Sequence, residues 1–330
     1  MKRIKNPRYE IIGWVIAIVF LMIFPLFSNK LTFMVNIVIY SLFAMGYNIC
    51  FGHSGMMTMA QGAFVGIGGF IVAILFSFWK TNAVAFLISL VVVTAVAYIL
   101  AIMLFMRLKV GSNPQTRSLY STIVTLGFLQ IMYYLSISVF SRWTGGSHGI
   151  SAYLRTPVNF GLFQIDMLNK TNSYYFIVIV GIISIITMRW FMSTPCREML
   201  SGIRENELRL AFLGHDVRSR KILMFIISCF FCGIAGCLNA CAYGVLDANT
   251  FSFNYITEAM IICVVGGRRT FYGPILGTII YLAAKYFISM YTDAWLLIVA
   301  AIIVIVCMYA PDGIGGIVQK MKLKKVNREA

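Results

Sequence analysis

The sequence has few charged residues, and very few of them are acidic. Charged residues make up 12% of the chain and only 11 are Asp or Glu, whereas 60% are hydrophobic. Soluble domains are about 45–50% apolar, so this composition excludes an ordinary soluble protein. Continuous apolar runs such as "LLIVAAIIVIVCMYA" also exclude a membrane β-barrel, whose strands alternate apolar and polar residues. We therefore expect an all-α integral membrane protein.

The apolar runs suit about ten membrane-spanning helices, because one crossing of a roughly 30 Å hydrocarbon core takes about 20 residues. The expected spans cover residues 11–27, 33–51, 56–78, 83–106, 119–140, 174–192, 222–242, 255–267, 272–291 and 294–310. The eighth span is short. The first begins with basic residues, as a signal peptide does. However, "FPLFSNK" lacks a small-x-small cleavage pattern, so we expect this span to be retained.

Residues that commonly carry catalysis are scarce and scattered. The three histidines, His53, His148 and His215, lack the spacing of metal ligands. No Gly-Lys dipeptide occurs, so a phosphate-binding loop of the GxxxxGK[ST] kind is absent. We expect a transport subunit that is no enzyme and binds no metal or cofactor, with any ATP hydrolysis on other chains. The alternatives are a membrane-embedded enzyme and a self-sufficient secondary transporter or channel.

No cysteine falls in an expected outer loop, so no disulfide framework is predicted. The stretch "CFFCGIAGCLNAC" offers possible metal ligands, but a second property of it favours packing. Small residues share one helix face there, namely Cys229, Gly233, Gly236 and Ala240. Such a face lets two membrane helices approach closely. We therefore predict helix packing at this stretch.

The positive charge is distributed unevenly along the chain. The net charge is +16, and 21 of the 27 Lys and Arg residues fall on one side when the ten spans are threaded with the N-terminus inside. Basic residues concentrate in cytoplasmic loops. The charge therefore indicates topology, with both termini cytoplasmic, and no nucleic-acid partner is expected.

Two segments between the spans have compositions that suggest a functional role. The outer segment 141–173 contains "RWTGGSHGIS" and is either a lid over helix ends or a docking surface for an external partner. The inner segment 193–221 predicts a helix of roughly 18 residues that starts at Thr194-Pro195 and stops at Gly214. Its mixed apolar and charged residues favour a helix that lies on the membrane or in a partner's groove.

A glycine-rich stretch, "CFGHSGMMTMAQGAFVGIGGF", interrupts the second and third spans. On a helix its glycines would share one face, with Thr58 close by: Gly55, Gly62, Gly66 and Gly69. Such a face allows tight contact with a neighbour or widens a passage. "GHSG" at 52–55 and "GGRRTFYGP" at 266–274 lie on the same side in the two halves of the chain, which is typical of a transport pathway.

Glu258 and Lys285 are among the few charged residues that fall inside expected spans. A charge in the bilayer is costly. Lys285 either extends its ammonium group outward to the membrane surface or forms an ion pair with Glu258.

An ordered set of motifs resembles one family over nearly the whole chain, from about Asn36 to Gly316. The motifs are "YNICFGHSGMMTMAQGAFVGIGGF", "STIVTLGFLQIMYY", "TGGSHGIS", "GIRENELRLAFLGHDVRSRKILMF", "FSFNYITEAMIICVVGG", "YGPILG" and "YAPDGIGG". Together they resemble the permeases of branched-chain amino-acid ABC importers, in particular the LivM-type subunits. Arg209 and Leu210 depart from the family pattern, since small alanines are usual there.

The resemblance implies a single permease domain over residues 1–330 in the bacterial plasma (inner) membrane. It implies four kinds of partner: a homologous second permease subunit, two ATPase subunits that hold ATP and magnesium, an extracytoplasmic substrate-binding protein and the lipid bilayer. The imported solute would be leucine, isoleucine or valine. Importers of the same class for urea, short amides or simple sugars are the alternative.

The resemblance also yields hypotheses about individual residues. ATPase coupling is expected at Arg204, Glu205, Glu207, Gly214 and Asp216. The pathway is expected to be bordered by Thr58, Gln61, Gly62, Gly66 and Gly69. The external docking loop is expected to include Thr144, Gly145, Gly146 and Ser147.

Overall fold

The computed structural model describes residues 31–79, 84–106, 114–151, 158–159, 164–165, 167, 169–193, 196–292 and a few positions between 294 and 316. Its longer helices are α2 (Leu31–Asn48), α3 (Ala60–Trp79), α4 (Val84–Met106), α5 (Pro114–Ile137), α7 (Lys170–Ser193), α8 (Cys196–Phe212), α9 (Val217–Tyr243), α10 (Phe253–Gly266) and α11 (Gly273–Ser289). The short elements are η1 (Ile49–His53), α6 (Ser141–Thr144), η2 (Gly146–His148), β1 (Ile150–Ser151), β2 (Val158–Asn159), β3 (Gln164–Ile165), β4 (Val245–Leu246) and η3 (Ala248–Phe251).

Eight of the ten expected spans coincide with helices. Six described helices are long and apolar enough to cross a membrane, and α10 and α11 are shorter apolar helices. With 14 residues, α10 is about 21 Å long, less than the roughly 30 Å of a hydrocarbon core. The expected spans 11–27 and 294–310 lie wholly and largely outside the described residues. The chain is thus confirmed as helical and membrane-spanning, while the count of ten stays a prediction.

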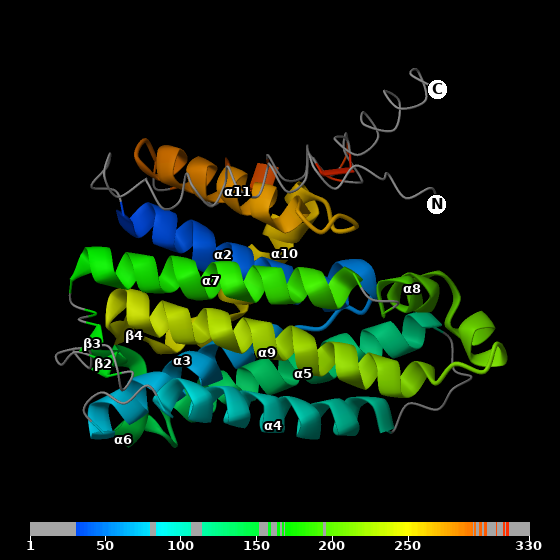
Figure 1. The fold of residues 1–330 in the computed structure, drawn as a ribbon, viewed down its shortest axis with the longest axis horizontal. Coiled ribbons are helices and arrows are strands. Elements are labelled where there is room, and N and C mark those ends of the chain that lie inside the picture. The colour runs from blue at the N-terminus through cyan, green and yellow to red at the C-terminus, as the bar shows by residue number, and fades with distance from the viewer. Residues whose placement is uncertain are drawn as a thin grey trace.

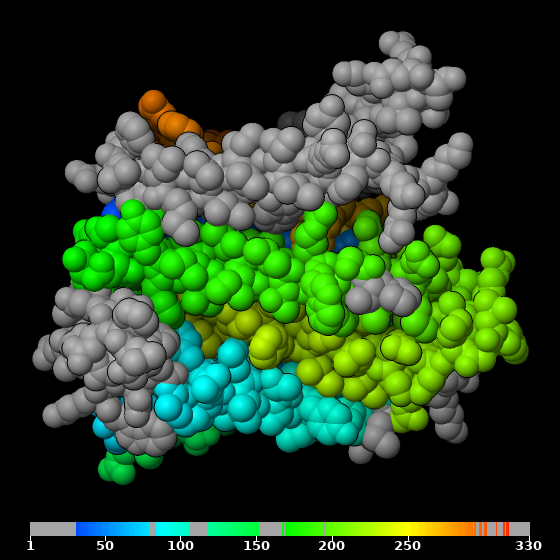
Figure 2. All heavy atoms as spheres, in the orientation of Figure 1, coloured from blue at the N-terminus to red at the C-terminus, as the bar shows by residue number. Residues whose placement is uncertain are grey.

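The long helices lie side by side, with α9 in the middle of the bundle (Figure 1). Helices α2, α3, α4 and α7 all pack against α9, and α10 and α11 pack against α2. Figure 2 shows α7, α9 and α4 as parallel bands on one broad face. The short strands lie at one end of the bundle and α8 at the other (Figure 1). We call these the strand end and the α8 end.

A close helix contact joins α3 to α9 through glycines. A Cβ atom on Gly68 would lie 2.5 Å from the Gly233 carbonyl oxygen, and one on Gly236 would lie 2.0 Å from that of Val65. The absence of side chains therefore sets the distance between the two helices. This contact confirms that the "CFFCGIAGCLNAC" stretch is used for packing.

The ends of α9 and α10 follow from local sequence. Asp216 caps α9, since its carboxylate accepts hydrogen bonds from the Ser219 amide at 3.2 Å and the Ser219 hydroxyl at 2.6 Å. Gly244 ends α9 at a positive φ of 61°. Ser252 caps α10 by accepting from the Tyr255 amide.

Glu258 and Lys285 form an ion pair. Lys285 Nζ on α11 donates to Glu258 Oε1 on α10 at 2.7 Å, and both side chains are largely buried. Of the two alternatives left open by the sequence, the structure therefore contains the pair. It joins α10 to α11.

Substitution of Gly236 by Ala should destabilise the α3–α9 contact. The new Cβ would require a backbone shift at Val65, and overpacking of this kind costs about 1–3 kcal/mol. Thermal unfolding of the purified chain in detergent measures the effect. Gly127→Ala on α5 is the matched control, because a Cβ there meets nothing within 4 Å among the described residues. An equal melting temperature for both variants would contradict this account of the contact.

Candidate functional site

The glycine-rich stretch is a break between two membrane helices. After α2 the chain makes one π-helical turn over Ile49–His53, and it is not helical again until α3 begins at Ala60. Gly55 lies in this break at a φ of +73°, a conformation that favours glycine. The prediction that Gly55 shares a helix face with Gly62 is therefore wrong, and the third span starts about four residues later than expected. A run with so many polar and glycine residues does not sustain a helix.

Helix α5 supplies hydrogen-bond partners for backbone groups of the break that have none within a helix. Thr122 Oγ1 donates to the Met57 carbonyl at 2.8 Å, and the Met59 amide donates to Thr125 Oγ1 at 2.9 Å. Buried backbone groups need such partners because water is absent from the bilayer core. The sequence interpretation missed these two threonines, although "STIVT" places hydroxyls at a three-residue interval that shares a helix face.

Beyond the break, a buried polar network joins α3 to α9. Gln61 Nε2 donates to Thr58 Oγ1 at 2.8 Å and to Ser228 Oγ at 3.2 Å, and Ser228 Oγ donates to the Gly46 carbonyl at 2.7 Å. Thr58, Gln61 and Ser228 have no exposed surface. The network is uncharged and its hydroxyl and amide groups satisfy one another.

The remaining predicted pathway glycines lie on α3 in close contact with other helices of the chain. A Cβ on Gly62 would lie 3.0 Å from Ile256 of α10 and 3.3 Å from Leu129 of α5. A Cβ on Gly66 would lie 2.3 Å from the ring of Phe251. A Cβ on Gly69 would lie 3.0 Å from the Gly236 carbonyl oxygen and 3.0 Å from the Leu246 side chain. The five predicted pathway residues thus follow one another along α3 and its entry, and all five are covered in this conformation.

At the α8 end, Arg204 holds the break from outside the bundle. Its Nη1 donates to the Gly52 carbonyl at 3.0 Å, and its Cγ would lie 2.8 Å from a Cβ on Gly55. Burial lowers the pKa of the Arg204 guanidinium, and the positive charges of Arg269 and Arg268 lower it further. A Cβ on Gly52 would lie 2.0 Å from the Arg268 carbonyl oxygen, so the α10–α11 loop also touches the break. The structure therefore brings together "GHSG" and "GGRRTFYGP".

Glu207 is also turned toward the bundle. Its carboxylate accepts from Lys221 Nζ of α9 at 2.7 Å, and the two side chains are only 13% and 12% exposed. Both residues line a cavity of about 120 Å³ that reaches Ser54 and Gly55 in the break. The Glu207 side chain therefore does not lie on a solvated face of α8.

The predicted single helix over this segment is wrong at one position, because α8 is kinked. Asn206 has an extended backbone (φ −160°, ψ 100°), and its side chain caps the second half by accepting from the Arg209 amide at 3.0 Å. Gly214 ends the segment at a φ of +84°, as predicted. The predicted start at Thr194 and Pro195 lies outside the described residues.

Helix α8 presents two different surfaces. Leu200 and Ile203 are buried against the bundle. Phe212 and Leu213 are 88% and 70% exposed, and Leu208 is also exposed. Among the predicted coupling residues, Glu205, Gly214 and Asp216 are exposed too. The hydrogen bonds from Ser219 lower the pKa of the Asp216 carboxyl group.

At the strand end, the predicted docking loop is a tight turn. Thr144 Oγ1 donates to the Ser136 carbonyl at 2.6 Å, and Thr144 and Gly146 are buried, whereas Gly145 and Ser147 are exposed. The loop is tied to the bundle because β1 pairs with β4 in antiparallel register. Thr144 and Gly146 therefore shape the turn, and Gly145 and Ser147 are accessible on it.

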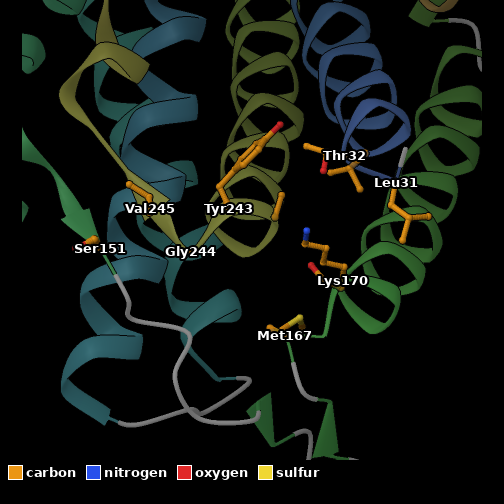
Figure 3. Close-up of a pocket in the computed structure, with 11 residues that line it drawn as sticks. Leu31, Thr32, Ser151, Met167, Lys170, Tyr243, Gly244 and Val245 are labelled. Carbon is orange, nitrogen blue, oxygen red and sulfur yellow. The ribbon is translucent and has the colours of Figure 1, made fainter. Parts of the chain in front are cut away.

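A pocket of about 420 Å³ opens beside this loop, at the strand end of α2, α7 and α9 (Figure 3). Thr32 and the Lys170 ammonium point into it from α2 and α7, and Met167 forms part of its apolar wall. Tyr243, also on the wall, donates its hydroxyl to Asn36 Oδ1. The pocket is separate from the break, which lies toward the α8 end.

Long apolar helices, a broken membrane segment and a charged helix outside the bundle define a polytopic membrane protein of the transport class. The family model described as branched-chain amino acid transport system / permease component matches residues 29–308. The chain belongs to this family, which confirms the resemblance seen in its motifs and the prediction of a transport subunit.

Two relatives illustrate the similarity. The chain is 25% identical over 301 residues to the high-affinity branched-chain amino acid transport system permease protein LivM of Escherichia coli (strain K12), covering 84% of this chain and 67% of the relative. It is 25% identical over 296 residues to the corresponding protein BraD of Pseudomonas aeruginosa, covering 84% and 91%. No solved structure matches the chain significantly.

Replacing Thr125 by Val should destabilise the break. The valine keeps the volume of threonine but leaves the Met59 amide without its acceptor, and a buried unsatisfied donor costs about 1–3 kcal/mol. The matched control is Thr94→Val on α4, because among the described residues the Thr94 hydroxyl bonds only the Leu90 carbonyl of its own helix. Thermal unfolding in detergent should show a lower melting temperature for Thr125→Val alone. A similar loss in both variants would mean that the Met59 bond adds no stability.

Proposed function

We propose that this chain is a permease subunit of an ATP-driven, binding-protein-dependent importer of leucine, isoleucine and valine in a bacterial inner membrane. Family membership and the names of the relatives support the substrate class. The observation that carries the transport mechanism is the contact of Arg204 with the break. A helix outside the bundle is thereby attached directly to the interrupted membrane segment.

The proposed topology has ten spans in a single permease domain, with both termini in the cytoplasm. The α8 end faces the cytoplasm and the strand end faces outward. Two observations support this orientation. Basic residues gather at the α8 end, and they are sparse in the loops of the strand end.

Helix α8 is the proposed docking element for the ATPase subunits, which bind ATP and magnesium. Phe212, Leu208 and Leu213 supply an apolar surface for the partner's groove, with Glu205 beside it. On the opposite side, Arg204 and Glu207 transmit movement of α8 to the break. Gly214 and Asp216 fix the connection from α8 to α9.

The external binding protein delivers the solute at the strand end, where Gly145 and Ser147 are accessible on the loop. The pathway is completed by a second permease subunit and is bordered by Thr58, Gln61 and the glycines of α3. These groups are neutral and already hydrogen-bonded, so they hold a zwitterionic amino acid weakly and release it readily. Selectivity therefore rests with the binding protein.

Purification from native membranes should recover this chain with a second permease and two ATPase subunits. In vesicles reconstituted with that complex, a leucine-loaded binding protein should stimulate ATP hydrolysis, and the binding protein without leucine should stimulate it less. A complex that responds only to a binding protein for another solute would overturn the substrate assignment. A chain that purifies alone and still moves leucine would overturn the importer assignment.

Charge reversal at Glu207 should uncouple hydrolysis from uptake. Glu207→Lys places two ammonium groups together, and an unpaired, largely buried charge is strongly destabilising. We expect about a tenfold fall in leucine transported per ATP hydrolysed. The exchange Glu207→Lys with Lys221→Glu restores an ion pair and should recover most of the coupling. Normal coupling in the single variant would refute a role for this pair.

A further inference from the structure

Helix α5 is exposed in a way that lipid does not explain. It is the least buried of the six long spans, with 22% of its residues buried, and also the least apolar, with a mean hydropathy of 1.3. Helix α4 is similarly open, with 33% buried, but its mean hydropathy is 2.8. A span that faces lipid is expected to be strongly apolar, because hydrocarbon offers no hydrogen bonds. Helix α4 meets this expectation and α5 does not.

The exposed residues of the two helices differ in kind. The large exposed residues on α4 are all hydrophobic or aromatic: Val84, Leu87, Val91, Tyr98, Ile99 and Met103. On α5 one exposed stripe at helical spacing consists of Leu119, Ile123, Gly127, Gln130 and Tyr134. We call this stripe the Gln130 face. It carries a side-chain amide within the span, which the exposed face of α4 lacks.

The Gln130 amide lies within the depth of the bilayer. It is seven residues before the end of α5 at Ile137, about 10 Å along the helix axis. Its carboxamide makes no hydrogen bond to another residue that the structure describes. The hydroxyls on the other side of α5 are already used, by Met57 and Met59 of the break. Gln130 would therefore stand unsatisfied in hydrocarbon if lipid covered this face.

Gly127 makes the same face suitable for another helix. A Cβ at Gly127 would meet nothing within 4 Å among the described residues, so the surface is a notch in the helix. Small residues at such positions let a neighbouring membrane helix approach closely, and side-chain amides form hydrogen bonds across the contact. A partner at this depth must itself span the membrane, which excludes the ATPase subunits and the binding protein.

We propose that the second permease subunit covers the Gln130 face, with one of its helices at Gly127 and a polar group bonded to the Gln130 amide. This inference rests on the proposed function, which supplies the second membrane-spanning subunit. It identifies the side of the bundle along which the two permeases meet.

Photo-crosslinking in the assembled importer tests the contact. A photoreactive amino acid replaces Ile123 on the Gln130 face or, as the matched control, Ile99 on α4. Both isoleucines are exposed, 67% and 58%, and both lie toward the α8 end of their helices. Mass spectrometry should find the second permease in the adduct from position 123 and not in that from position 99. Equal yields from both positions, or adducts from 123 that lack the second permease, would overturn the proposal.

Gln130→Leu provides a second measurement. Leucine is compatible with lipid, but it removes the proposed hydrogen bond to the second permease. Recovery of the second permease with this chain in detergent should therefore fall about threefold or more. The melting temperature of the isolated chain should be unchanged, and Ile99→Leu should alter neither property. Undiminished recovery in Gln130→Leu would count against the contact.

If even the unaltered chain recovers no second permease, the proposed function fails as well. If it does recover one, a negative crosslinking result rejects this inference alone.

Discussion

The structure depends on satisfying the backbone of a chain segment that stops being helical inside a membrane protein. In the last turn of η1 and from there to Ala60, amide and carbonyl groups leave the helical hydrogen-bond ladder where lipid supplies no replacement. Thr122 and Thr125 provide bonds from α5, and Arg204 provides one from α8. The break therefore fixes the positions of two helices that are distant from it in sequence.

This arrangement attaches α8 to the core of the bundle. Arg204 bonds the Gly52 carbonyl, and Glu207 pairs with Lys221 at the start of α9, so α8 is attached to both the break and the central helix. Helix α9 in turn contacts α3 through glycines, and the two backbones are so close that a Cβ atom would not fit between them. A displacement of α8 would therefore be passed to α3 from two directions. The kink at Asn206 separates this attached half from the exposed half around Phe212.

The sequence allowed the helical spans to be predicted because long apolar runs have few other solutions in a membrane. It also allowed the packing glycines of α9 to be predicted, because small residues at helical spacing share one face. It failed at Gly55, which lies in a stretch of several non-helical residues packed against Arg204. It also failed at Asn206, where one residue leaves the helix and its side chain caps the second half of α8. Partners distant in sequence, such as Glu207 with Lys221 or Met59 with Thr125, depend on the path of the whole chain, and periodicity does not contain that information.

The covered state of α3 limits how a path along it could open. Gly62 and Gly66 are filled by Ile256, Leu129 and Phe251, which belong to α10, α5 and η3. On the opposite side, Gly68 is in backbone contact with α9. The side toward α9 cannot open without breaking the close backbone contacts at Gly68 and Gly236, whereas the other side is filled by side chains, which can withdraw. A path bordered by Gln61 and the α3 glycines would therefore form by movement of α5, η3 and α10 away from α3, with α3 and α9 moving as one unit.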